Sequence, residues 1–197
     1  MYDYFDGRLC NISPTQVTVD CGGVGYALQI SLHTYSVIKD KEAGRLFAHH
    51  VVREDAQLLF GFAEEEERRI FRELLSVSGV GAGTARVVLS SMTARQVKQV
   101  IVAGDVVSLQ KVKGIGAKTA QRIIIDLQDK LKKGDQGTGV AIFISGSYNN
   151  GSEEALSALL TLGFSRASAE KAIQQASKSL GSAPPVEELI KVALTYL

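Results

Sequence analysis

A stretch of twelve residues occurs twice in this chain, and the repeat limits the fold more than any other feature. The first copy is Leu74–Ala85 (LLSVSGVGAGTA) and the second is Leu109–Ala120 (LQKVKGIGAKTA). They align without a gap at a displacement of 35 residues, with seven identical positions. An internal repeat of this kind predicts two copies of one supersecondary unit.

Each copy predicts two helices joined by a tight hairpin. An apolar helical stretch ends near Val77 or Val112, a Gly-apolar-Gly turn follows, and a new helix begins. Glycine permits backbone angles that a side chain would forbid. We expect the apolar residue between the glycines, Val80 or Ile115, to insert into the core.

The start of the second helix in each hairpin is a predicted phosphate site. Its first backbone N–H groups have no partner inside the helix, and adjacent glycines let an anion come close. The pattern resembles the helix-hairpin-helix motif, which holds the sugar-phosphate backbone without reading bases. The candidate DNA-binding residues are Gly79, Val80, Gly81, Gly83, Thr84 and Arg86 in the first hairpin, and Lys111, Lys113, Gly114, Ile115, Gly116, Lys118, Thr119 and Arg122 in the second.

The two hairpins differ in charge. The second carries Lys118 where the first has Gly83, and it adds two more lysines and Arg122, whereas the first has only Arg86 nearby. We therefore expect the second hairpin to hold phosphate by charge and amides, and the first mostly by amides.

The whole chain predicts an α+β multidomain protein. Residues 1–62 predict an OB-like β-barrel, because five short segments are rich in strand formers and turn residues separate them. The strands are Tyr2–Leu9, Gln16–Cys21, Val24–Ile30, Leu46–Arg53 and Gln57–Phe62, with turns at Asn11 and Ser13-Pro14 and a short helix at Ser31–Ile38. Cys10 and Cys21 lie in strands without metal-ligand spacing, which predicts buried thiols.

Residues 63–133 predict an all-α domain built around the hairpins. Its first helix, Ala63–Val77, begins with the acidic run Glu64–Glu67, which suits the helix dipole. Thr93 is a candidate N-cap, and Gly104-Asp105 ends the helix that follows it.

The last part of the chain predicts a linker and a small helical domain. Residues 134–151 have the glycine-rich composition of a flexible linker, interrupted by the apolar Val140–Ile144. Residues 152–197 predict a three-helix bundle suited to docking a partner protein, although a structural cap on the helical domain is the alternative. The predicted inward residues are Leu156, Leu159 and Leu160 in the first helix, and Leu189, Val192 and Tyr196 in the third.

Composition excludes some classes of protein. The net charge is only +1, so a DNA-binding surface must be local and balanced by acid elsewhere. No apolar run reaches membrane-spanning length and no signal-peptide pattern begins the chain, which predicts a cytoplasmic protein without membrane contact. The chain has no Gly-x-x-x-x-Gly-Lys-Ser/Thr loop, and we expect neither a metal nor another cofactor.

Glu54 and Asp55 form an acidic pair at the expected tip of the last barrel hairpin. The residues alone predict no more than a solvated turn with Arg53 as a local counter-charge.

The order of barrel, tandem hairpins, linker and three-helix bundle closely resembles the RuvA family, the Holliday-junction-binding subunits of bacterial RuvAB branch-migration complexes. The resemblance spans the full length and is most specific at Gly22–Tyr26, Val51–Phe62 and Gly114–Ala120, with a further match at Leu162–Phe164. Gly83 departs from the pattern, because the family often has lysine there.

The resemblance implies a tetramer on an open, square-planar four-way junction, or two tetramers as an octamer. Each subunit would place two hairpins on the duplex arms, and Glu54 and Asp55 would form a pin at the centre. Residues 152–197 would dock and regulate the RuvB hexameric ATPase in recombination, DNA repair and the SOS response, with the resolvase RuvC as a further candidate partner. The chain itself would not be an enzyme.

Two other functions are considered. A helix-hairpin-helix glycosylase or nuclease would need a catalytic acid beyond the hairpin, where Asp126 stands, but a solvated partner of Lys130 is the simpler role for it. A scaffold whose hairpins bind protein is the other, and the lysines of the second hairpin argue against it.

Overall fold

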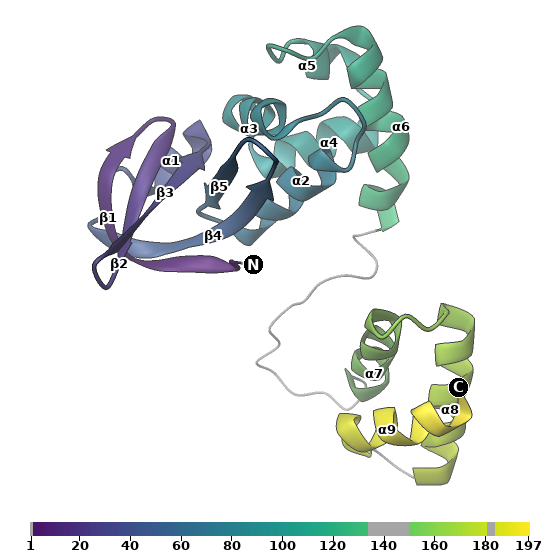
Figure 1. The fold of residues 1–197 in the computed structure, drawn as a ribbon. Coiled ribbons are helices and arrows are strands. Elements are labelled where there is room, and N and C mark those ends of the chain that lie inside the picture. The colour runs from purple at the N-terminus through teal and green to yellow at the C-terminus, as the bar shows by residue number, and fades with distance from the viewer. Residues whose placement is uncertain (1, 134–149, 181–183) are drawn as a thin grey trace. The chain divides into compact units, whose positions relative to one another are not determined.

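The computed structural model describes residues 2–133, 150–180 and 184–197 (Figure 1). Contacts divide the chain into two compact units, Met1–Gly139 and Val140–Leu197. The described part of the first unit holds the strands and six helices, and that of the second holds three helices and a 3-10 turn.

The strands form a closed five-stranded barrel, as predicted. They are β1 (Tyr4–Ser13), β2 (Gln16–Cys21), β3 (Val24–Ile30), β4 (Ala43–Val52) and β5 (Gln57–Phe62), in the order β1-β2-β3-β5-β4. All pairs are antiparallel except β3 with β5. Between β3 and β4 runs the helix α1 (Leu32–Ile38), whose N-cap is Ser31. Alternate residues such as Val17 and Val19 fill the barrel.

Asn11 does not end a strand, so the turn predicted there was wrong. β1 continues through it to Ser13, and the register with β2 shifts between Cys10 and Ser13. Asn11 has a φ of 49°, a left-handed conformation that asparagine tolerates better than most residues. The residue therefore makes a bulge within a longer strand.

The cysteines are only partly as predicted. Both are free thiols, but both are half-buried rather than buried. Cys21 packs against the barrel core, and its thiol donates to the carbonyl of Asp6.

The helical part of the first unit contains five helices. They are α2 (Glu65–Leu75), α3 (Ala82–Ser91), α4 (Ala94–Ala103), α5 (Val106–Gln110) and α6 (Ala117–Lys133). Thr93 caps α4 as predicted, in a reciprocal capping box with Gln96. Gly104 ends α4 with a φ of 73°, which glycine adopts without steric cost.

Strand β5 and the helices share a hydrophobic core. Phe60 and Phe62 of β5 pack against Phe71 of α2, with ring centroids 5.0 and 4.9 Å apart. The same cluster includes Val80 and Ile115 from the two hairpins. The hairpins therefore share a core with β5, whereas the inside of the barrel forms a second cluster that includes Val17 and Val19.

The second unit is a small bundle of α7 (Asn150–Thr161), α8 (Arg166–Leu180) and α9 (Val186–Ala193), followed by a 3-10 turn at Leu194–Tyr196. α7 begins inside the predicted linker, and Val140–Ile144 lies outside the described residues. The core residues include Ala155, Leu159, Ala172 and Leu189.

Two residues predicted to face inward in this bundle are exposed. Leu160 is 39% exposed, because Ala155 and Leu159 occupy the inner face of α7. Tyr196 is 49% exposed, because the chain tightens into a 3-10 turn that changes the angle between successive side chains.

Candidate nucleic-acid interface

The two hairpins repeat the same backbone hydrogen bonds at the displacement of 35 residues. At both turns the glycine before the apolar plug has a left-handed backbone, with φ of 90° at Gly79 and 92° at Gly114. Three backbone hydrogen bonds define each hairpin. In the first they are Val77 N to Leu74 O (3.2 Å), Val80 N to Val77 O (3.0 Å) and Ala85 N to Gly81 O (2.9 Å). Their equivalents in the second are Val112 N to Leu109 O (3.1 Å), Ile115 N to Val112 O (3.1 Å) and Ala120 N to Gly116 O (2.9 Å).

The burial pattern also repeats. Val80 and Ile115 are each 5% exposed and insert into the shared core, as predicted. Val77 and Ala85 are buried in the first copy, and their equivalents Val112 and Ala120 are buried in the second. With the apolar residues fixed inward, the glycines and the start of the next helix face outward.

The outer face of each hairpin is open to a ligand. A Cβ atom placed at any of five hairpin glycines would meet no atom within 4 Å, namely at Gly79, Gly81, Gly83, Gly114 and Gly116. Gly81 is the N-cap of α3 and has no side chain to satisfy the first amides of that helix. These amides are therefore available to an anion that approaches over the glycines.

The second hairpin adds a concentrated positive charge. Lys111, Lys113, Lys118 and Arg122 are all exposed, and none forms an ion pair with a described residue. Asp105 lies nearby at the N-cap of α5, and hydrogen bonds from the side chain and amide of Ser108 lower its pKa. Thr119 is half-buried at the start of α6.

The first hairpin is weaker in charge, and its arginine is engaged elsewhere. Arg86 is half-buried on α3, and its Nη1 donates to the carbonyl of Thr15 in the turn between β1 and β2 (3.3 Å). Gly83 is exposed and Thr84 is half-buried. Backbone amides are thus the main binding groups that the first hairpin offers.

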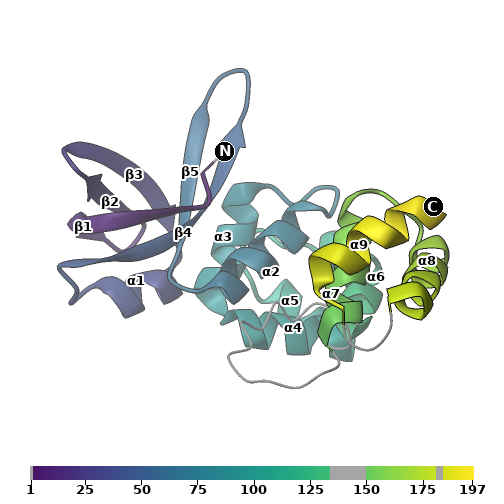
Figure 2. The same ribbon diagram turned by 90° about the horizontal axis from the view of Figure 1, so that it is seen from below.

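Glu54 and Asp55 lie at the tip of the hairpin formed by β4 and β5. Figure 2 shows this hairpin projecting beyond the other strands of the barrel. The Arg53 amide donates to the Ala56 carbonyl (2.8 Å) and closes the turn, and both acidic side chains are exposed. We call these two residues the acidic turn.

Two charged residues of α2 are buried. Glu67 and Arg68, in the first turns of α2, are 0% and 5% exposed. Burial raises the pKa of Glu67, despite hydrogen bonds from Ser31 and Thr34 that favour the charged form. Burial opposes the charge of Arg68 as well, but hydrogen bonds to Glu65 and Asp3 outweigh it and raise the pKa.

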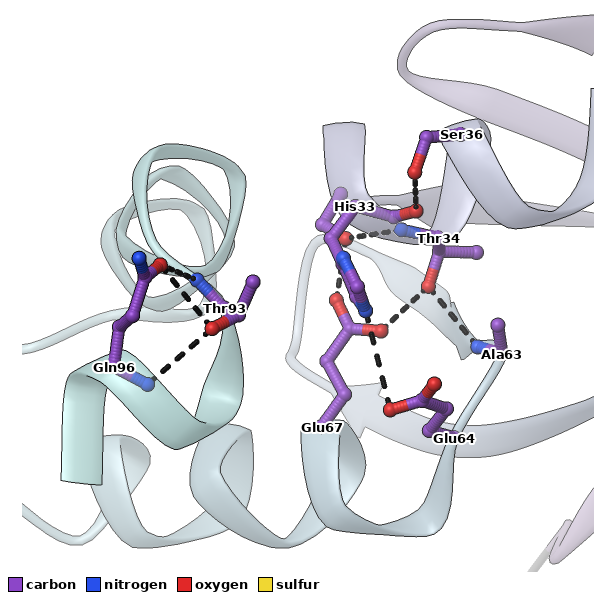
Figure 3. A network of polar contacts seen from close by, with 9 residues as sticks. His33, Thr34, Ser36, Ala63, Glu64, Glu67, Thr93 and Gln96 are labelled. Atoms are coloured by element: carbon purple, nitrogen blue, oxygen red, sulfur yellow. Dashed lines mark hydrogen bonds and ion pairs between the residues drawn. The ribbon is translucent and has the colours of Figure 1, made fainter. Parts of the chain in front are cut away.

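A signal for this burial was present in the sequence. Glu67 precedes Ile70 by three residues and Phe71 by four, so it falls on the buried stripe of α2. The acidic run Glu64–Glu67 therefore begins the helix as predicted, but Glu67 lies on its buried face. Its carboxylate points from α2 toward Thr34, as Figure 3 shows.

Asp126, the candidate catalytic acid, lies on the surface of α6. Lys130 pairs with Glu73 of α2 (Nζ to Oε2, 3.8 Å), so its predicted pairing with Asp126 was wrong. Among the described residues, no three His, Cys, Asp or Glu side chains gather as a metal site.

Three family models match the chain in this order. They are the RuvA N terminal domain at residues 1–61, the SAM-like helix-hairpin-helix tandem at residues 71–129, and the RuvA C-terminal domain at residues 150–197. Curated relatives align over whole chains. The "Holliday junction branch migration complex subunit RuvA" of Christiangramia forsetii is 48% identical over 199 residues, covering 100% of both chains.

The chain belongs to the RuvA family. The RuvA proteins of Flavobacterium psychrophilum, 46% identical, and Bacteroides fragilis, 42% identical, also align over 100% of both chains. The predicted resemblance is therefore confirmed. Of the helices that the structure describes, none has the length and apolarity to span a membrane.

Proposed function

We propose that this protein binds four-way DNA junctions through its two hairpins, independently of base sequence. One observation carries the proposal: the hairpins match bond by bond, and both present open glycine faces and unused helix amides outward. Such groups fit phosphate oxygens and contact no base edge. The positive charge of the second hairpin supplies the salt-dependent part of the affinity.

In this proposal the protein acts as a tetramer, and its acidic turns meet at the crossover. Two acids from each of four subunits repel phosphates and keep duplex arms from closing over the centre. The same repulsion disfavours continuous duplex, so it supplies selectivity for junctions. Residues 1–62 would form the barrel domain, residues 63–133 the DNA-binding domain and residues 134–151 the linker.

Residues 152–197 would dock the RuvB motor. The relatives' name, a subunit of a branch migration complex, supports such a partnership. The bundle exposes apolar side chains beyond its own core, which are suited to a protein contact: Leu160, Leu162, Phe164, Leu194, Tyr196 and Leu197. The protein would work in the cytoplasm without catalysis of its own, and RuvC and an octameric form belong to the same proposal.

Competition binding tests the proposal. A labelled four-way junction is bound at fixed salt and displaced with unlabelled junction or with linear duplex of matched length. We expect a preference for the junction of about a hundredfold, equivalent to about 2.7 kcal/mol. Equal affinity would leave a general backbone-binding protein and contradict the junction assignment.

A charge-neutral variant of the acidic turn tests the pin. Glu54→Gln/Asp55→Asn keeps the shape of both exposed side chains, so the fold should be unaffected. We expect the variant to bind linear duplex more tightly and to lose part of its junction preference. An unchanged preference for the junction over linear duplex would show that Glu54 and Asp55 form an ordinary solvated turn without a role in selectivity.

A further inference from the structure

A buried polar network joins the barrel to the helix that leads into the first hairpin. Oε2 of Glu67 accepts from the Thr34 hydroxyl (2.6 Å), and Oε1 accepts from the Ser31 hydroxyl. Thr34 Oγ1 in turn accepts from the Ala63 amide (3.0 Å), as Figure 3 shows. Ser31 also caps α1 by accepting from the Thr34 amide (3.0 Å). We call Ser31, Thr34, Ala63 and Glu67 the Glu67 network.

With an ionised Glu67, every hydrogen-bond donor of the Glu67 network has an acceptor. Each hydroxyl has one proton, and each gives it to a different carboxylate oxygen. The lone pairs of the same hydroxyls accept the two amides. Each donor and acceptor of the network therefore has one fixed partner and one bond direction. A contact between apolar side chains imposes no such direction.

Arg68, the next residue of α2, also binds the barrel. Its Nη1 donates to the carbonyl of Asp3 (2.6 Å), to the carboxylate of Asp3 (2.7 Å) and to the carbonyl of Ala48 on β4 (3.2 Å). Its Nη2 pairs with Glu65 (2.6 Å). Two successive residues of one helix thus bind α1, β4 and the residue that precedes β1.

Stability alone is a poor reason for this arrangement. Phe60, Phe62 and Phe71 already bury an apolar interface between barrel and helices. Desolvating a charge costs several kcal/mol, and well-packed apolar side chains often serve as well in its place. What charged groups add to an apolar interface is a fixed orientation, because hydrogen bonds weaken steeply when they bend.

We propose that Glu67 and Arg68 are positioning residues, which hold the barrel and its acidic turn at one orientation relative to the two hairpins. The consequence for DNA rests on the proposed function: a junction requires the pin at the crossover and the hairpins on the arms at the same time. Binding to linear duplex does not require both contacts at the same time. Loosening the Glu67 network should therefore lower selectivity more than affinity for duplex.

The test compares Thr34→Val with Thr34→Ser in the full-length protein. Valine keeps the volume but removes the hydroxyl, whereas serine keeps the hydroxyl and is the matched control. Nitroxide labels at Val24→Cys in the barrel and Val107→Cys on α5 report the orientation, since both positions are exposed. Cys10 and Cys21 are replaced by serine in every sample.

We expect Thr34→Val to broaden the distribution of label-to-label distances and Thr34→Ser to leave it unchanged. Junction preference should fall about tenfold in Thr34→Val, equivalent to 1.4 kcal/mol, with duplex affinity retained. If circular dichroism shows that Thr34→Val is unfolded, Glu67→Gln replaces it, since it keeps the shape but puts a donor where an acceptor is needed.

Three outcomes would overturn the inference. They are a wild-type distance distribution in the folded variant, an unchanged junction preference despite a broadened distribution, and equal effects of valine and serine. Failure of the proposed function can be told apart from failure of this inference, because the label-to-label distances are measured on the protein without DNA. A wild-type protein without junction preference would remove only the DNA consequence, and the distances would still decide the orientation.

Discussion

Adding the lysine that the first hairpin lacks should strengthen DNA binding. Gly83 occupies the position of Lys118 in the second hairpin, and the two hairpins share their backbone hydrogen bonds. A Cβ at Gly83 would meet no atom within 4 Å, and its backbone does not require glycine. The variant Gly83→Lys therefore places a charge beside the first amides of α3 without disturbing the fold.

The expected effect is a steeper salt dependence. A tetramer with roughly 8 to 16 phosphate contacts should give a slope of log K against log salt near roughly −7 to −14. One new contact in each of four subunits adds about −3.6 to that slope. At about 0.2–1 kcal/mol for each exposed ion pair, the affinity should rise by roughly fourfold to several hundredfold.

The control separates charge from helix stability. Replacing glycine inside a helix stabilises it by roughly 0.5–1 kcal/mol whichever side chain enters, so Gly83→Gln carries this effect without the charge. Fluorescence anisotropy on a labelled junction at five or more salt concentrations gives the slopes. The reciprocal variant Lys118→Gln should make the slope shallower. Equal slopes for Gly83→Lys and Gly83→Gln would refute the assignment of the first hairpin as a phosphate site.

Three further predictions follow from particular residues. Deleting 152–197 should leave junction affinity within about twofold and abolish stimulation of the RuvB ATPase; retained stimulation would contradict the docking role. Gly114→Ala should cost about 1–2 kcal/mol in urea unfolding because of its left-handed backbone, whereas Gly116→Ala, which lacks that conformation, should leave stability unchanged and weaken DNA binding. Because burial raises the folded pKa of Glu67, the folded protein binds a proton at this carboxyl more readily than the unfolded chain does. Relative to Glu67→Gln, the wild type should therefore lose stability as pH rises from about 4.5 through the folded pKa, and the opposite slope in paired unfolding curves would contradict that direction.

The hairpins could be predicted from the sequence because their determinants are local. Each of their defining hydrogen bonds joins residues three or four positions apart, and each plug residue is flanked by its own glycines. The barrel followed from short strand segments and turn residues, and the caps at Thr93 and Gly104 followed from residue type. Such features depend on side-chain chemistry within a few residues.

Contacts that the sequence did not reveal join residues far apart in the chain. Glu67 meets partners 36 and 33 residues away, and Arg68 and Arg86 meet theirs 65 and 71 residues away. A charged side chain on a helix stays in solvent unless a hydrogen-bonding or charged partner compensates its burial. No local sequence pattern predicts which residue is that partner. Glu67 lay on the apolar stripe of α2, which hinted at burial but not at Ser31 or Thr34.

The order of the domains, the paired hairpins and the family could be predicted from the sequence, because repeats, glycines and apolar periodicity act over one or two turns of chain. The contact of Arg86 with the barrel, the exposure of Tyr196 and Leu160, and the burial of Glu67 and Arg68 became known only from the three-dimensional fold. The physical reason is that burial and hydrogen-bond partnership depend on distant segments meeting in space. The relation between acidic turn and hairpins is therefore a property of the fold and not of either motif.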